Sequence, residues 1–177
     1  IQGGIIQMVN HGLSTGALFM FVGFLYDRRP TREIADYGGI LKTMPIYGSL
    51  FLVIVLSSIG LPGLNGFIGE FMILIGSFNS PLLHNHTFTI AATTGVVLSA
   101  VYLLWMYQRV LLGPITKEEN KTIPDLNFRE IFASSLLIIF IVWIGVYPNT
   151  FLSKSEASVN KLIQNAQTIK TNLIKLP

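Results

Sequence analysis

The residues best suited to chemistry in this sequence are an acid and a histidine that each interrupt an apolar stretch. Glu70 lies in the run SSIGLPGLNGFIGEFMILIGSF (57–78), which holds no other charged residue. A carboxyl group at membrane depth is costly, so its presence there indicates a functional group, and proton carrying is the chemistry that a lone acid offers. The alternative is a structural hydrogen bond, or a position of Glu70 near the membrane surface.

His11 lies within the apolar run 1–26, and histidine is a side chain that serves as a proton carrier in proteins. The alternative is a buried histidine bonded to a neighbouring carbonyl. Ser14 and Thr15 follow one helical turn later, where their hydroxyls could extend a water chain from His11. Hydroxyls in membrane helices also bond to their own backbone, so this extension competes with a local role.

Composition excludes several other kinds of site. The sequence contains no cysteine, which excludes disulfides and thiolate ligation of zinc or iron–sulfur clusters. His84 and His86 flank Asn85, but no third ligand is close in sequence, so we expect solvated loop histidines and no metal site. The net charge of +3 comes without a dense basic tract, so nucleic-acid binding is not expected.

The elements that must position Glu70 and His11 are membrane helices. The chain is 51% hydrophobic and 12% charged, whereas soluble domains carry roughly 25% charged residues. Its apolar runs approach the ~20 residues that cross a bilayer. We therefore predict an all-α, polytopic membrane helix bundle with about five transmembrane segments in a domain over 1–149, followed by a polar, amphipathic tail over 150–177. The predicted segments are 1–26, 45–60, 63–78, 88–112 and 129–147.

The segment that contains Glu70 is predicted to be one part of a discontinuous helix. Pro62, Gly63 and Gly66 interrupt the apolar run within LPGLNG (61–66), where a turn or an unwound stretch is expected. Backbone freed in this way must lie inside protein or against a water-filled cavity. Counting 45–60 and 63–78 as separate spans places the basic loops 27–44 and 113–128 on opposite faces, which leaves the orientation open. The chain also begins at Ile1 inside an apolar run, as expected for a fragment.

Several stretches together resemble one family, the antiporter-like membrane subunits of respiratory complex I, and within it the C-terminal part of subunit M, called subunit four in mitochondria. The resemblance is colinear and covers the chain except for its tail. It rests on IQMVNHGLSTGALFMFVGFLYDR (6–28), REIADYGGI (32–40), SSIGLPGLNGFIGEFMILIGSF (57–78), VLSAVYLLWMYQRVLLGP (97–114) and FREIF (128–132).

The resemblance implies a fold of about fourteen helices in two inverted repeats, each with a broken helix, a common transporter plan. This chain would hold most of the second repeat. Glu70 matches the acid of the family's Gly-Glu-Phe motif, where sister subunits carry lysine, and His11 matches a histidine on the central hydrophilic axis. The family's buried lysines and its Glu–Lys pair lie earlier in the family's chain and outside this sequence, so a complete proton path cannot be drawn from it.

The function implied is proton translocation, through His11 to Glu70 along a water chain, as a membrane-arm subunit of NADH–quinone oxidoreductase. NADH, FMN, iron–sulfur clusters and quinone are then expected in partner subunits, and none of them in this chain. The expected surroundings are other membrane-arm subunits and the lipid of a bacterial plasma membrane or an organelle inner membrane. The alternatives are a subunit of a multisubunit cation/proton antiporter, a ferredoxin- or coenzyme-driven version of the complex, and a scaffold that pumps nothing.

Overall fold

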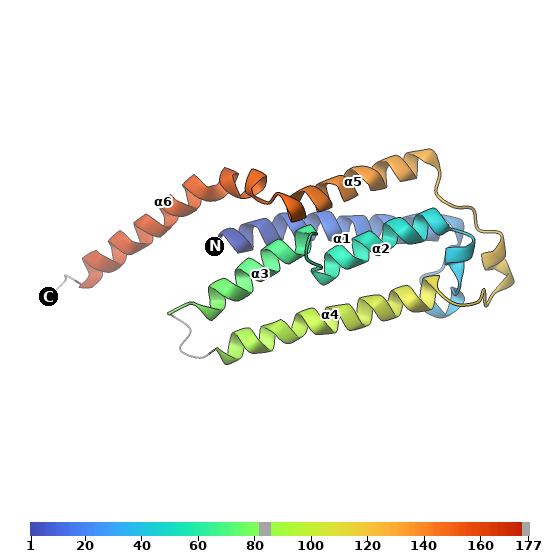
Figure 1. Ribbon diagram of the computed structural model, residues 1–177, viewed down its shortest axis with the longest axis horizontal. Helices are drawn as coiled ribbons and strands as arrows, with labels where there is room; N and C mark the ends of the chain where they lie inside the picture. The colour runs from blue at the N-terminus through green and yellow to red at the C-terminus, as the bar shows by residue number, and fades with distance from the viewer. Residues whose placement is uncertain (82–85, 175–177) are drawn as a thin grey trace.

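The computed structural model describes residues 1–81 and 86–174, and every regular element in these ranges is a helix (Figure 1). This confirms the predicted all-α class. The long helices are α1 (Gln2–Arg28), α2 (Pro45–Ile59), α3 (Asn65–Phe78), α4 (Thr87–Leu111), α5 (Phe128–Val146) and α6 (Asn149–Ile174). Three short 3₁₀ turns lie in the connections: η1 (Ile34–Asp36), η2 (Ile40–Lys42) and η3 (Glu118–Lys121). Of these helices, α1, α4 and α5 are long and apolar enough to cross a membrane, while α2 and α3 are shorter apolar helices.

The discontinuous helix predicted from the sequence is observed as α2 and α3, which follow each other in the same direction (Figure 1). Gly60 ends α2 in the left-handed conformation, with φ of 85°. Its N–H bonds to Ser57 O, and the N–H of Leu61 bonds to Leu56 O, which is the Schellman arrangement. Helix α3 restarts at Asn65, inside the predicted LPGLNG break, so the two halves together form one broken crossing.

The two basic loops lie at the same end of the bundle, so the prediction of opposite faces is wrong (Figure 1). The N–H of Gly39 bonds to Leu112 O at 3.1 Å, and Arg28 Nε donates to Pro124 O at 2.8 Å. The reason is that the break in 60–64 interrupts the helix without reversing the chain. The five predicted apolar segments are all helical, but 45–60 and 63–78 share one crossing.

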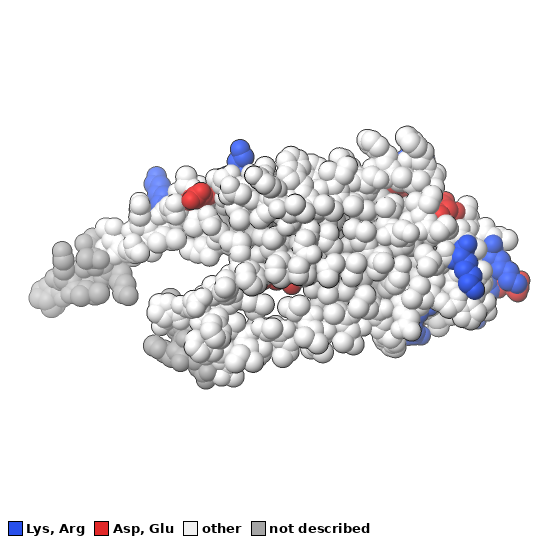
Figure 2. Space-filling model, in the orientation of Figure 1, with Lys and Arg blue, Asp and Glu red and all other residues white. Residues whose placement is uncertain are grey.

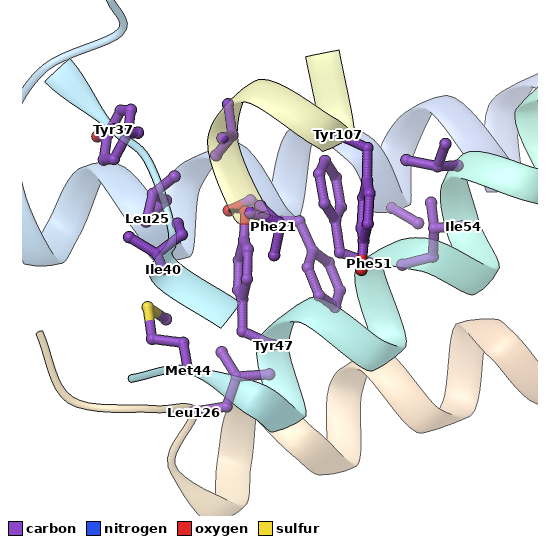
Figure 3. Close-up of a cluster of buried hydrophobic side chains, with 14 of the residues drawn as sticks. Phe21, Leu25, Tyr37, Ile40, Met44, Tyr47, Phe51, Ile54, Tyr107 and Leu126 are labelled. Atoms are coloured by element: carbon purple, nitrogen blue, oxygen red, sulfur yellow. Dashed lines mark hydrogen bonds between the residues drawn. The ribbon is translucent and has the colours of Figure 1, made fainter. Parts of the chain in front are cut away.

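An aromatic cluster forms the core near this loop end (Figure 3). The rings of Phe21 on α1 and Tyr47 on α2 have centroids 5.1 Å apart, and Phe51 stacks on Phe21 at 5.6 Å. The hydroxyl of Tyr107 on α4 donates to Gly48 O at 3.1 Å, and the Tyr47 hydroxyl donates to Phe21 O at 3.3 Å. Aromatic packing with satisfied hydroxyls therefore fixes α1, α2 and α4 together.

Two acidic side chains bind the α4–α5 loop to this end. The carboxylate of Asp125 accepts hydrogen bonds from the backbone N–H groups of Ile46 and Tyr47, at 2.8 and 3.0 Å, and so caps the start of α2. Glu130 forms a bidentate ion pair with Arg28, at 2.6 and 2.9 Å, and also completes the capping box of α5 with Asn127. The first turn of α5 is therefore fixed to the end of α1, and the first turn of α2 to Asp125, whose carbonyl oxygen accepts a hydrogen bond from Arg28.

The molecular surface fits an apolar environment. Figure 2 shows Lys, Arg, Asp and Glu gathered mainly at the loop end and along α6. Large apolar side chains lie exposed on the flanks, among them Phe19 (73%), Leu98 (62%) and Phe132 (64%). The tail forms the long helix α6, which extends away from the bundle (Figure 1). The division of the chain at 149/150 stays a prediction.

Candidate functional site

The carboxyl group of Glu70 lies at the break between α2 and α3. Glu70 follows Asn65, the first residue of α3, by little more than one turn, and its side chain folds back against the end of α2. A Cβ atom placed on Gly60 would overlap Glu70 Oε2, so the carboxyl group lies directly on the backbone of Gly60. The acid therefore lies against the backbone of the left-handed turn that ends α2.

A cavity of about 150 Å³ connects the predicted site residues. Glu70, His11, Ser14 and Thr15 all line it, and Thr15 Oγ1 lies 3.3 Å from His11 Nδ1. Five other residues with polar side chains also line it: Gln7, Asn10, Ser57, Ser58 and Tyr102. A cavity of this size holds several water molecules, each occupying about 30 Å³ in the liquid. Water in this cavity has access to both His11 and Glu70.

Asn65 ties the start of α3 to α1 and α2. Its side-chain Oδ1 lies 3.2 Å from Ser14 Oγ and 2.5 Å from Ser57 Oγ, and the two hydroxyl oxygens are 2.8 Å apart. Asn10 Nδ2 donates to Asn65 O at 2.7 Å, and Asn65 Nδ2 donates to Asn10 O at 3.3 Å. All four side chains belong to buried residues. Ser14, predicted as a water-chain residue, is thus engaged mainly with protein, whereas Thr15 faces His11.

Of the three residues predicted to form the break, the two glycines are in close contact with other helices. Pro62 is exposed within the break, and Gly63 has φ of 93°. Gly66 is already helical, and a Cβ atom there would overlap the carbonyl oxygen of Ser57. Gly145 of α5 packs against the Gly63 carbonyl so closely that a Cβ atom would overlap it. The path of the break is therefore fixed from both sides.

Sequence reasoning missed seven residues of this region: Gln7, Asn10, Ser57, Ser58, Asn65, Tyr102 and Gly145. The signal for five of them was a polar side chain inside an apolar helix or at its interruption. Ser57 and Ser58, for example, immediately precede the break. Gly145 carries no such signal, because glycine is frequent in membrane helices.

The structure gives no indication of a metal centre in its described part. No group of three or more His, Cys, Asp or Glu side chains gathers within 1–81 and 86–174. His86 stacks on Phe78 with centroids 4.2 Å apart, while His84 lies outside the described residues. The chemistry available at the site is that of hydroxyl, amide, imidazole and carboxyl groups around a cavity, which suits hydrogen-bonded water and proton transfer.

The chain is similar in sequence to known membrane proteins. Residues 1–99 match the family described as NADH:quinone oxidoreductase/Mrp antiporter, TM. The chain is 44% identical to NADH-quinone oxidoreductase subunit M of Rhodobacter capsulatus, over 93% of this chain and 31% of that protein. It is 41% identical to NADH-ubiquinone oxidoreductase chain 4 of Marchantia polymorpha, over 94% and 33%. The chain thus spans about a third of the length of the curated relatives it matches.

Two solved structures contain chains with the same arrangement. A chain of respiratory complex I from Thermus thermophilus with bound NADH superposes with a TM-score of 0.75 at 31% identity, over 85% of this chain and 31% of that one. A chain of the membrane-bound sulfane sulfur reductase, an archaeal respiratory membrane complex, gives 0.77 at 25% identity, over 88% and 25%.

Proposed function

Because the chain belongs to the NADH:quinone oxidoreductase/Mrp antiporter family of membrane proteins, we propose that it is part of the proton-translocating subunit M of an NADH–quinone oxidoreductase. Electron transfer from NADH to quinone takes place in partner subunits, which hold the NADH, FMN, iron–sulfur clusters and quinone. This chain holds no redox centre and acts as a translocase. The names of its relatives, subunit M and chain 4, support this proposal.

The observation that carries the proposal is the position of Glu70 at the helix break, on a cavity that also reaches His11. Protons pass along water in this cavity from His11, which Thr15 contacts at 3.3 Å, to the carboxyl group of Glu70. From Glu70 they leave toward the positive side of the membrane. Because polar side chains line the cavity beside Glu70, the site remains hydrated at membrane depth.

The proposed surroundings follow from the chain's exposed apolar flanks. Other membrane-arm subunits and lipid cover these flanks, and the complex lies in a bacterial plasma membrane or an organelle inner membrane. Extended apolar flanks, with exposed side chains such as Phe19 and Leu98, mark a contact surface for lipid or protein. Bacterial and plant relatives are consistent with either membrane.

A multisubunit cation/proton antiporter is the alternative function, and a ferredoxin- or coenzyme-driven complex is a second. The carboxyl group of Glu70 supports membership of the redox complex. Antiporter relatives, like the sister subunits, more often carry lysine at this position. The Rhodobacter and Marchantia relatives, at 44% and 41% identity, are both named as oxidoreductase subunits. The same fold also occurs in a chain of the archaeal sulfane sulfur reductase, which is a differently named respiratory complex.

The proposal is tested with Glu70→Gln in the full-length subunit within the assembled complex. Proton pumping is measured in sealed vesicles, together with the rate of electron transfer from NADH to quinone. We expect pumping to fall by about 100-fold or more, the size of effect that loss of a proton-transferring group produces, while the complex still assembles. The matched control is Glu156→Gln, on the exposed side of α6, which should pump as wild type.

Normal pumping and normal electron transfer in Glu70→Gln would contradict the proposal. Such a result would make Glu70 a structural residue and favour the scaffold alternative. Sodium- or potassium-dependent proton movement without NADH would instead favour the antiporter.

A further inference from the structure

A second cavity meets the first at Glu70. It lies between α3 and α4, has a volume of about 400 Å³, and is lined on its far side by Ala92, Gly95 and Ser99. Four residues line both cavities: Gln7, Ser58, Glu70 and Tyr102. Glu70 therefore has one cavity toward His11 on α1 and another toward α4, with Gln7 and Ser58 in the wall that the cavities share.

Gln7 and Ser58 each present a buried polar atom to this junction. Gln7 Oε1 and Ser58 Oγ are fully shielded from the surface, and neither has a hydrogen-bond partner among the described residues. Buried polar groups are almost always paired, and a polar cavity of sufficient size satisfies them with ordered water. Asn10 Oδ1 is a third such atom, but Asn10 lines only the first cavity. The two unpaired atoms at the junction, Gln7 Oε1 and Ser58 Oγ, therefore indicate a position for an ordered water molecule.

The side chain of Gln7 is held in place by close packing on α3. A Cβ atom at Gly69, the residue before Glu70, would overlap Gln7 Oε1 and lie 2.8 Å from Gln7 Cβ. Gly69 is buried, so the contact leaves little room for the amide to move toward α3. An amide oxygen that is buried, fixed and adjacent to the acid is suited to orienting a water molecule rather than to carrying a proton itself.

From these contacts we propose that Gln7 and Ser58 position a water molecule that passes protons between Glu70 and the two cavities. The inference rests on the proposed function of Glu70. The water accepts a proton from the first cavity and donates one of its own to the Glu70 carboxylate; in the next step the Glu70 carboxyl group returns a proton, which leaves through the second cavity. Gln7 accepts and Ser58 donates or accepts hydrogen bonds throughout, and neither changes its protonation state.

The test uses Gln7→Met, Ser58→Ala and the double variant in the assembled complex. Methionine keeps the length and shape of Gln7 but removes its amide oxygen. Each single change should lower the pumping rate about tenfold, which corresponds to about 1.4 kcal/mol in the barrier. If both residues hold the same water, the double variant loses no more than either single variant, because interacting sites are not additive. Ser58→Thr, which keeps a hydroxyl, should remain near wild type.

The controls and a second readout separate positioning from simple damage. Gln164→Met and Ser153→Ala make the same changes on the exposed surface of α6 and should pump as wild type. In Gln7→Met the ratio of pumping rates in H₂O and D₂O should rise, because proton transfer becomes slower than the other steps. A merely structural loss lowers the number of active complexes and leaves this ratio unchanged.

Three results would overturn the inference: wild-type pumping in both single variants, independent losses that multiply to about 100-fold in the double variant, or an unchanged isotope ratio. The proposed function is judged separately. If Glu70→Gln stops pumping while Gln7→Met and Ser58→Ala pump normally, the relay stands and the water position is wrong. If Glu70→Gln pumps normally, the proposed function itself fails.

Discussion

The two halves of the broken helix are held in different ways. Helix α2 is buried in the aromatic core through Tyr47, Phe51 and Ile54, and Asp125 caps its first turn. Helix α3 buries only Asn65, Gly66 and Gly69, all within its first five residues, and it exposes large apolar side chains further along. Apolar packing thus fixes one half, while hydrogen bonds and glycine contacts near the break fix the other.

The aromatic core therefore stabilises the fold, whereas the contacts at the break position the site. Removing atoms from the aromatic core leaves a cavity and costs folding free energy. Changes beside the break alter hydrogen bonds and backbone contacts around the carboxyl group, with a smaller cost in stability. Mutations at the two places should therefore affect different measurements, and three substitutions test this, in order of expected effect.

Phe21→Ala should cause the largest loss of stability. Phe21 is fully buried and contacts the rings of Tyr47 and Phe51. Truncating a buried phenylalanine costs about 3–5 kcal/mol, which should show as a lower denaturant midpoint and less assembled complex. Phe19→Ala is the matched control, because Phe19 is 73% exposed on the same helix. Equal losses of stability in both variants would show that the aromatic cluster does not stabilise the fold.

Gly145→Ala should have an intermediate effect and act mainly on the site. The added methyl group overlaps the backbone of Gly63 and Leu64, so the break must move. Overpacking of this kind costs about 1–3 kcal/mol, and pumping should fall more than the quantity of assembled complex. Gly23→Ala is the control, since nothing lies within 4 Å of a Cβ atom there. Normal pumping in Gly145→Ala would mean that the position of the break does not matter to the site.

Asp125→Ala should have the smallest effect of the three and should act on stability alone. The substitution leaves the N–H groups of Ile46 and Tyr47 without their carboxylate partner. Loss of a helix cap costs about 1 kcal/mol, measured as a small decrease in the denaturant midpoint with pumping per complex unchanged. Glu119→Ala, on an exposed part of the same loop, is the control. A loss of pumping per complex in Asp125→Ala would show that α2 is coupled to the site.

Much of the fold could be predicted because its signals are local. Apolar runs marked the helices, and proline with glycine marked the break. Glu70 and His11 are conspicuous in sequence because each is a titratable group in an apolar run, and both line the same cavity. Composition and spacing do not give the direction of the chain, so they predict two spans that meet at 60–64 and basic loops on opposite faces, whereas the chain continues in one direction through the break.

The remainder of the site depends on packing between distant segments. Asn10 and Asn65 exchange hydrogen bonds across 55 positions of sequence. The role suggested for Gln7 comes from an unpaired buried oxygen and a close contact with Gly69. Gly145 is indistinguishable in sequence from glycines that touch nothing, such as Gly23. These features belong to the assembled bundle and appear in no single helix.

The left-handed turn at Gly60 also has a mechanical consequence. A continuous helix behaves as a stiff rod, because each turn is hydrogen-bonded to the next and an axial push at one end reaches the other. The chain at 60–64 lacks this continuous ladder, because the N–H of Leu61 bonds back to Leu56 O and the N–H of Leu64 bonds to Leu61 O. The position of α3 is therefore not transmitted along the axis of α2 and depends instead on lateral contacts, such as those of Asn65 with Asn10 and of Gly63 with Gly145.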